Sequence, residues 1–248
     1  CHDGTAHLGG LGVADQVGAQ VRSWTAQPAR PTRGTGNLTM ATSDLLVWVD
    51  CEMTGLDLIN DELIEVAALV TDAELNVLGD GVDLVIKPSH RALDQMGDFV
   101  RGMHESSGLL NALDGGLSMA EAEQRILDYV RAFVAEPGKA PLAGNTIGTD
   151  RAFLARDMPT FERHVHYRSV DVSSIKELVR RWYPRVYYQA PAKGGNHRAL
   201  ADVRESIEEL RYYREAVFVA QPGPDSAAAK EIADHHQGAL TGAVPVQD

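Results

Sequence analysis

The stretch VWVDCEMTGLD at residues 47–57 decides the fold. Its apolar start, with Val and Trp, is typical of a buried β-strand. Asp50 and Glu52 follow, and because side chains alternate across a strand the two acids lie on one face while Cys51 faces the other. Two carboxylates this close repel one another when both are ionised, and a divalent cation between them would remove that cost.

Oxygen ligands favour Mg²⁺ or Mn²⁺ over zinc. The sequence has two cysteines, Cys1 and Cys51, and no Cys/His cluster with zinc spacing, so it predicts neither a structural zinc site nor a disulfide framework. This cysteine usage is typical of the reducing cytoplasm, which is the expected location. Taken alone, however, the acid pair is better interpreted as two solvated carboxylates at a strand end.

Composition and charge limit the partners. Hydrophobic residues make up 44% and charged residues 23%, as in an ordinary globular protein, and no apolar run approaches the roughly 20 residues of a membrane span. The net charge of −12 argues against a protein that coats long nucleic acid, because such binding needs many Lys and Arg contacts to phosphates. A small anionic substrate or a divalent cation is compatible with this charge.

The chain divides into three parts. Residues 1–43 are rich in Pro, Gly and Thr and lack apolar periodicity, so we expect a disordered extension or an artefact, with the natural start at Met40. Residues 44–218 carry the regular patterns of a single domain. Residues 219–248 are expected to be a mobile tail with a short helix near 227–235.

The order of elements in the central part predicts an α/β domain with a mixed sheet. Three strands with short connections, near 45–50, 62–71 and 79–88, indicate an antiparallel meander. Alternating helices and short strands follow. Helices are expected after the capping-box pairs Ser118/Glu121 and Ser174/Glu177, at 149–158 and from near His197; short strands are expected at 140–145 and 168–174.

Two further segments carry candidate site residues. Asp150 begins a helix after a Gly-containing loop, where an acid also simply favours the helix dipole. His197 precedes Asp202 with four residues between them, a step of about 500° on a helix, so the two side chains do not stack. His197 is therefore expected in the loop or first turn, from which both could reach one cleft. A surface His beside an exposed Asp is the alternative.

Four carboxylates and one imidazole from three segments suit two-metal phosphoryl chemistry. One metal would lower the pKa of an attacking water, and both would hold the in-line displacement. His197 could take the proton of that water, because imidazole titrates near neutral pH.

Basic residues suggest an anionic substrate. Between Lys176 and Arg198 the chain has six Lys or Arg and one acid, although a solvated helix face explains most of them equally well. Tyr167, Arg168 and Ser173 form a mixed group that could bind a phosphate. The alternative is that Arg168 is a surface charge and Ser173 belongs to a helix cap.

Three motifs resemble those of the DEDD superfamily of 3′-to-5′ exonucleases: DCEMTGLD (50–57), GNTIGTDRAFL (144–154) and NHRALADVRES (196–206). The His ahead of the last Asp is typical of the histidine subgroup. HYRSVDVSSIKELVRRW (166–182) and ESIEELRYYRE (205–215) are similar to the oligoribonuclease family specifically, and the resemblance spans about residues 44–216.

The resemblance implies an RNase H-like fold and removal of nucleotides from the 3′ end of very short RNAs, down to dinucleotides, giving 5′-monophosphates. It implies that two Mg²⁺ or Mn²⁺ ions are held by Asp50, Glu52, Asp150 and Asp202, that His197 is the general base, and that the enzyme is a homodimer.

The resemblance also implies substrate contacts. In this family a His, a Tyr, a Ser and an Arg, with a contribution from the partner subunit, cap the 5′ phosphate, and the matching residues are His104, Tyr167, Ser173 and Arg168. Leu56 resembles a residue that wedges beside a base. Where the family usually has Trp, this chain has Phe99, which offers a smaller face for stacking or belongs to the core.

Two other functions stay open. A broader exonuclease acting on DNA or RNA 3′ ends would use the same chemistry. An inactive exonuclease fold used as a binding module would be expected to have lost one of the five acidic and histidine residues, and all five are present.

Overall fold

The computed structural model describes residues 44–192, 194 and 197–241. The predictions for residues 1–43, including the start at Met40, lie outside the described residues. Within the described part, no helix combines the length and apolar character needed to cross a membrane.

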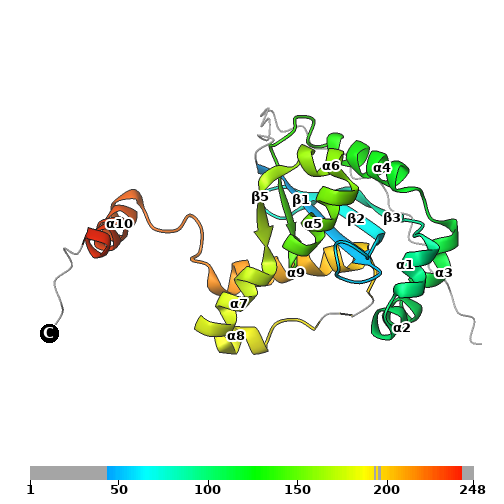
Figure 1. The fold of residues 1–248 in the computed structure, drawn as a ribbon. Helices are drawn as coiled ribbons and strands as arrows, with labels where there is room; N and C mark the ends of the chain where they lie inside the picture. Colours follow the sequence, from blue (N-terminus) through cyan, green and yellow to red (C-terminus); the bar gives the residue numbers. More distant parts are fainter. Residues whose placement is uncertain (1–43, 193, 195–196, 242–248) are drawn as a thin grey trace, which may run out of the picture. The chain divides into compact units, whose positions relative to one another are not determined.

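A five-stranded mixed sheet forms the centre of the domain (Figure 1). The strands, in chain order, are β1 (Leu46–Met53), β2 (Leu63–Thr71), β3 (Val77–Val85), β4 (Pro141–Gly144) and β5 (His166–Asp171). Their spatial order is β3-β2-β1-β4-β5, with β1, β2 and β3 antiparallel and β4 and β5 parallel to β1. The predicted antiparallel meander followed by parallel strands is confirmed.

Helices cover both faces of the sheet (Figure 1). The helices of the described part, in chain order, are α1 (His90–Gln95), α2 (Asp98–Ser106), α3 (Leu109–Ala112), the 3₁₀ turn η2 (Leu113–Gly115), α4 (Met119–Arg131), α5 (Ile147–Asp157), α6 (Pro159–His164), α7 (Val172–Trp182), α8 (Pro184–Tyr188), α9 (Ala199–Val217) and α10 (Ser226–Thr241).

Alternation along β1 divides the core in two. Val47, Val49 and Cys51 pack with the apolar faces of α4, α5 and α6. Trp48 faces the other way and packs with α7 and α9. Asp50 and Glu52 share the parity of Trp48, so β1 presents both acids on the face that α9 covers, and Cys51 lies in the opposite core as expected.

Capping-box spacing in the sequence predicted the start of α4 correctly and the start of α7 incorrectly. Ser118 and Glu121 form a complete capping box at α4, as predicted. The predicted box of Ser174 and Glu177 is wrong, because α7 already begins at Val172 and Asp171 caps it by accepting from the Ser173 N–H. The strand expected at 168–174 accordingly ends at Asp171.

Candidate active site

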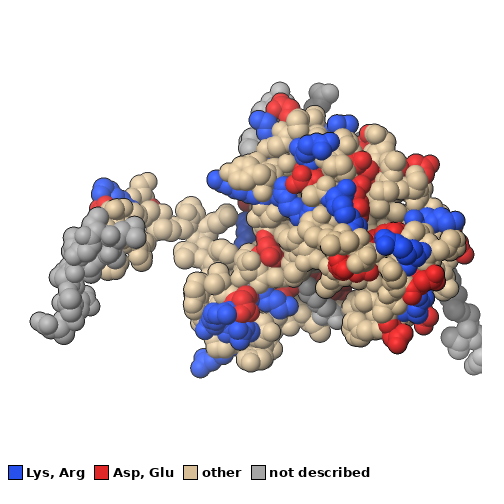
Figure 2. Space-filling model, viewed as in Figure 1, with Lys and Arg blue, Asp and Glu red and all other residues tan. Residues whose placement is uncertain are grey.

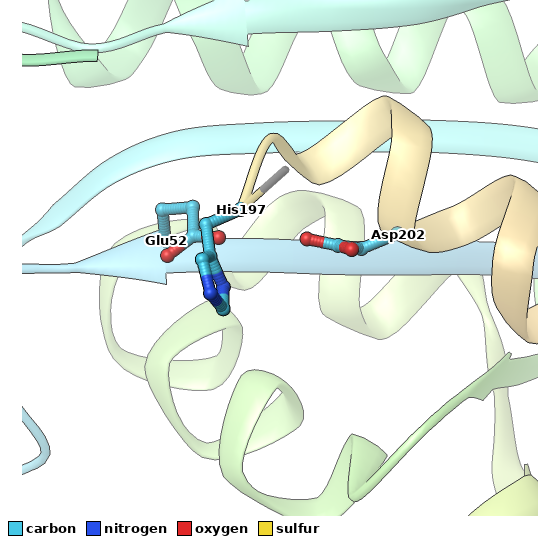
Figure 3. Close-up of side chains that lie close together, drawn as sticks. All are labelled: Glu52, His197 and Asp202. Carbon is cyan, nitrogen blue, oxygen red and sulfur yellow. The ribbon is translucent and has the colours of Figure 1, made fainter. Parts of the chain in front are cut away.

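Glu52, His197 and Asp202 meet at the carboxyl end of β1. Each offers a ligand atom within 4.8 Å of the others. Figure 3 shows the Glu52 side chain beside the His197 imidazole, with the Asp202 carboxylate directed toward both from α9. Glu52 is buried and His197 is exposed, so the group lies at the boundary between core and solvent.

His197 lies just ahead of α9, as the five-residue step to Asp202 required. Its backbone is left-handed, with φ of 45°, a conformation that a residue with a Cβ rarely adopts and that often occurs at functional sites. Asp202 lies in the first turn of α9. One short stretch of chain thus delivers both side chains to Glu52 from different directions.

Asp150 reaches the same strand end from α5. It is buried in the first turn of that helix, and its Oδ1 accepts the Cys51 backbone N–H at 2.9 Å. This bond places the Asp150 carboxylate against the backbone between Asp50 and Glu52. The turn before α5 contains Thr146 in a left-handed conformation, with φ of 53°.

The carboxylates strongly perturb one another. Burial, then repulsion from Asp150, Asp202 and Glu52, raises the pKa of Asp50 to about 9. Burial and the same kind of repulsion raise the pKa of Glu52 to about 8, and burial raises that of Asp150 to about 6. Crowded, desolvated oxygen donors are what a divalent cation would neutralise, so the donor set fits Mg²⁺ or Mn²⁺.

His104, from the last turn of α2, lies beside Glu52 and is fully buried. Its Nε2 lies 2.9 Å from the Met53 carbonyl oxygen, and its Nδ1 lies 3.9 Å from Glu52 Oε2 without a hydrogen-bond partner. Burial lowers the pKa of His104. With Nε2 donating to the carbonyl, Nδ1 is left as an acceptor facing the Glu52 carboxyl.

Comparison with known proteins identifies the family. A family model described as an exonuclease, RNase_T, matches residues 47–210. The oligoribonuclease of Streptomyces coelicolor is 68% identical over 194 residues, covering 78% of this chain and 97% of that protein. The chain belongs to the oligoribonuclease family. The oligoribonucleases of Cutibacterium acnes, 65% identical over 80% of this chain and 98% of that protein, and Mycobacterium leprae, 58% identical over 76% and 88%, are also similar.

Solved structures show the same fold. Exonuclease I of Methylocaldum szegediense aligns with a TM-score of 0.50 at 24% identity, over 79% of this chain and 44% of that one. A zinc-bound E. coli exonuclease I in complex with single-stranded DNA aligns with a TM-score of 0.53 at 17% identity, over 82% and 46%. The chain thus spans less than half the length of these exonucleases, and at this identity the likeness confirms the RNase H-like fold alone.

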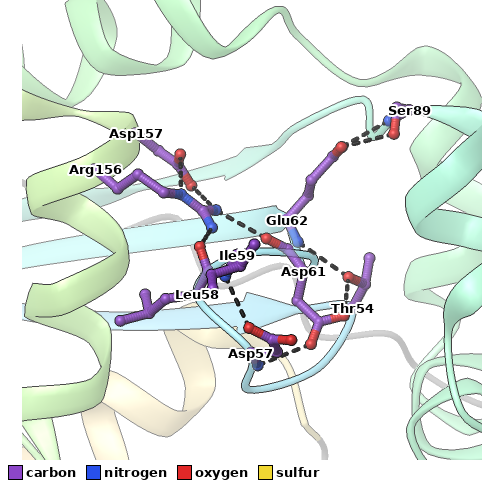
Figure 4. A network of polar contacts seen from close by, with 9 residues as sticks. All are labelled: Thr54, Asp57, Leu58, Ile59, Asp61, Glu62, Ser89, Arg156 and Asp157. Atoms are coloured by element: carbon purple, nitrogen blue, oxygen red, sulfur yellow. Dashed lines mark hydrogen bonds and ion pairs between the residues drawn. The ribbon is translucent and has the colours of Figure 1, made fainter.

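The loop expected to carry the oligoribonuclease wedge is tightly held (Figure 4). Asp61 accepts from the Thr54 hydroxyl and the Asp57 N–H, both at 2.9 Å. Arg156, on α5, donates to the carbonyl oxygens of Leu58 and Asp61. Leu56 itself is 76% exposed, so this loop presents an apolar side chain to solvent.

The residues matched to the oligoribonuclease phosphate cap contact different neighbours in the single chain. His104 touches Glu52 and Met53, as described. Tyr167 is exposed on β5, with the Arg168 guanidinium carbon 5.5 Å from its ring centre. Ser173 joins the turn before α5: its hydroxyl donates to Asn145 Oδ1 at 3.0 Å and accepts the Thr146 N–H at 2.9 Å.

Phe99, matched to the family's Trp, is 85% exposed on α2, so the structure places it at the surface and not in the core. It is available to stack on a base.

Several residues of the basic stretch at 176–198 pair with acids. Arg180 and Arg181 both pair with Glu177, and Lys176 pairs with Glu209 at 3.1 Å. Figure 2 shows Lys and Arg interspersed with Asp and Glu over the face that is drawn. The solvated-face interpretation therefore accounts for these residues better than a phosphate-binding track.

Sequence patterns missed the buried acid that lies nearest to the site in the sheet, Glu65. It lies on β2 directly opposite Glu52 and is fully buried. The available signal was a carboxylate within the otherwise apolar run LIEVAALV (63–70), since buried acids almost always have a partner.

Proposed function

We propose that this chain is a 3′-to-5′ exoribonuclease that hydrolyses very short oligoribonucleotides, down to dinucleotides, to 5′-monophosphates in the cytoplasm. The observation that carries the proposal is the group of crowded carboxylates with raised pKa values in a chain 68% identical to an oligoribonuclease over 97% of that protein.

Each residue has a role in this proposal. Asp50, Glu52, Asp150 and Asp202 would hold two Mg²⁺ or Mn²⁺ ions, which when bound supply positive charge for the scissile phosphate and acidify the attacking water. His197, exposed beside Glu52, accepts the proton of that water. Leu56 and Phe99 bind the bases, and the left-handed backbone at His197 directs its imidazole to the acids.

Product analysis tests this function. RNAs of two, five and twenty nucleotides, labelled at the 5′ end, are incubated with the protein in Mn²⁺ or in EDTA. We expect rapid, metal-dependent cleavage of the dinucleotide and little cleavage of the twenty-mer. Equal rates at all lengths, or on matching DNAs, would instead indicate a general exonuclease, and no cleavage by a folded protein would indicate a binding module.

Length selection is proposed to rest on a 5′-phosphate cap to which His104, Tyr167, Arg168 and Ser173 contribute, together with the partner subunit. A phosphate held at its end leaves no room for a further nucleotide, so a dinucleotide fits and a long RNA does not. Arg168→Ala should reduce the ratio of dinucleotide to twenty-mer kcat/KM on the order of tenfold, the value of one charge-assisted contact. An unchanged ratio would remove Arg168 from the cap. Arg163→Ala, an exposed arginine on α6, is the matched control.

The homodimer is proposed to use the apolar surface of α7 and the end of α9. Leu178, Trp182 and Phe218 are 43%, 66% and 54% exposed there and line a groove of about 210 Å³. An exposed apolar surface of this kind is typical of a protein contact. Sedimentation should give two chains per particle, and Trp182→Glu should give one. Ile232→Glu on α10, also an exposed apolar position, should leave the dimer intact.

A further inference from the structure

Glu65 is a buried acid that the proposed chemistry does not use. It stands on β2 as the direct partner of Glu52 on β1, and its side chain is completely excluded from solvent. An ionised carboxylate in this position must be fully hydrogen-bonded to be tolerated.

Three of its hydrogen bonds go to the start of α9, and its side chain also contacts Asp83 on β3, which lies 3.9 Å from Arg198 Nη2. Oε1 accepts from Arg198 Nε at 2.8 Å and Nη2 at 2.6 Å, and Oε2 accepts the Ala199 backbone N–H at 3.0 Å. Arg198 is the N-cap residue of α9, yet its own side chain makes no capping bond. Glu65 thus caps α9 from the sheet, with a negative charge at the positive end of the helix.

In sequence, Arg198 and Ala199 lie between the two site residues His197 and Asp202. His197 immediately precedes Arg198, and the Asp202 N–H donates to the Arg198 carbonyl oxygen at 3.0 Å. A shift of Arg198 would therefore move His197 directly and Asp202 through the first turn of the helix. We call the contacts of Glu65 with Arg198 and the Ala199 N–H the clamp. Because Glu65 pairs directly with Glu52 across β1 and β2, the clamp holds the start of α9 beside the strand position that carries Glu52.

We propose that Glu65, acting through Arg198 and the Ala199 N–H, is a positioning residue that holds His197 and Asp202 at their working distance from Glu52. The proposal rests on the proposed function for the roles of His197 and Asp202. Stability alone does not account for the pair, because a buried ion pair is often replaced by apolar residues without loss of stability.

A double variant tests the clamp without leaving Glu65 or Arg198 behind as a single charge, while Asp83 loses the cation that lies 3.9 Å away. Glu65→Leu with Arg198→Met removes both partners and fills similar volume. The matched control is Glu74→Leu with Arg214→Met, which removes the ion pair near the other end of α9, about 24 Å along the helix. Three measurements are made on each: dinucleotide kcat and KM, Mn²⁺ affinity by calorimetry, and hydrogen exchange of the segment 197–203.

In the Glu65/Arg198 variant we expect kcat to fall roughly 10–100-fold, with KM changed little, as for residues that support a metal site without touching substrate. Mn²⁺ affinity should fall by a similar factor, and exchange at 197–203 should accelerate. The control should match the wild type in all three.

Wild-type kcat, Mn²⁺ affinity and exchange in the folded double variant would overturn the proposal. If the double variant does not fold, Glu65→Gln, which keeps one acceptor and loses the charge, takes its place, and wild-type values there would be equally decisive against it. If the wild-type protein neither cleaves RNA nor binds Mn²⁺, the proposed function is wrong. The clamp is then judged by hydrogen exchange alone: faster exchange at 197–203 in the double variant supports it, and unchanged exchange overturns it.

Discussion

At the scale of the residue, Asp150 has two tasks that one substitution can separate. Its Oδ1 accepts the Cys51 N–H at 2.9 Å, and its charge repels Asp50 and Glu52. Asp150→Asn keeps an acceptor for Cys51 and removes the charge. We expect dinucleotide kcat to fall by more than the 10–100-fold typical of residues that only support a metal site, while the melting temperature in EDTA at pH 8 rises.

Steady-state kinetics and calorimetry on the same preparation check both halves of this prediction. Glu136→Gln, at an exposed acid outside the site, controls for the loss of one acidic charge. An active Asp150→Asn enzyme would remove Asp150 from the metal ligands.

Motif spacing predicted part of the arrangement, because a strand fixes the parity of Asp50 and Glu52 and a helix step fixes the offset of Asp202 from His197. That Asp150 joins them as a metal ligand was implied by the family resemblance. Glu65 could not be found this way. Its partner, Arg198, lies 133 positions away, and only the β1–β2 register and the path into α9 bring the two together.

At the scale of the element, the loop at 54–62 is tied to α5. Arg156 donates to two loop carbonyl oxygens, pairs with Asp157 and lies over the Phe153 ring at 4.9 Å. The same helix carries Asp150. The loop that presents Leu56 and the helix that presents a proposed metal ligand therefore behave as one unit.

Arg156→Ala should free the loop and raise the dinucleotide KM several-fold with a smaller change in kcat, because it loosens base binding and leaves the acids in place. Arg156→Lys should recover only part of the loss, since an ammonium cannot reproduce the fork that reaches Leu58 and Asp61. Initial-rate measurements over a range of dinucleotide concentrations decide this, and an unchanged KM would mean that the loop does not need the arginine.

Elements with strong periodicity were predictable, and short ones were not. The alternation of β1 and the apolar stripe of α9, with Val203, Ile207 and Leu210 buried, are visible in the sequence. Helices α1, α2, α3 and α8 have four to nine residues, too few for a periodic pattern. At α7 two capping signals compete, and Asp171 prevails because it also accepts the Thr146 N–H at 3.0 Å from a turn 25 positions earlier.

At the scale of the whole molecule, the protonation of the site acids contributes to the pH dependence of the free energy of unfolding. The pKa values of Asp50 and Glu52, about 9 and 8, lie above their ordinary values of 3.8 and 4.5. Between about pH 4 and pH 9 the folded protein therefore holds protons that the unfolded chain has released. The stability that these two acids contribute falls as the pH rises through this window, the opposite of what a salt-bridged acid produces.

Metal should reverse this dependence. In EDTA we expect the melting temperature to drop by roughly 5–10 °C from pH 5 to pH 9, since a few kcal/mol correspond to that range for a chain of this size. In excess Mn²⁺ the loss should shrink or invert, because the cation binds the deprotonated carboxylates of the folded state only and stabilises it more as they ionise. Scanning calorimetry at three pH values measures the pH dependence of the melting temperature with and without metal.

The Asp50→Asn/Glu52→Gln variant cannot ionise at these two positions. Its melting temperature in EDTA should depend less on pH, and it should respond less to Mn²⁺. A pH dependence equal to that of the wild type would show that Asp50 and Glu52 do not cause it.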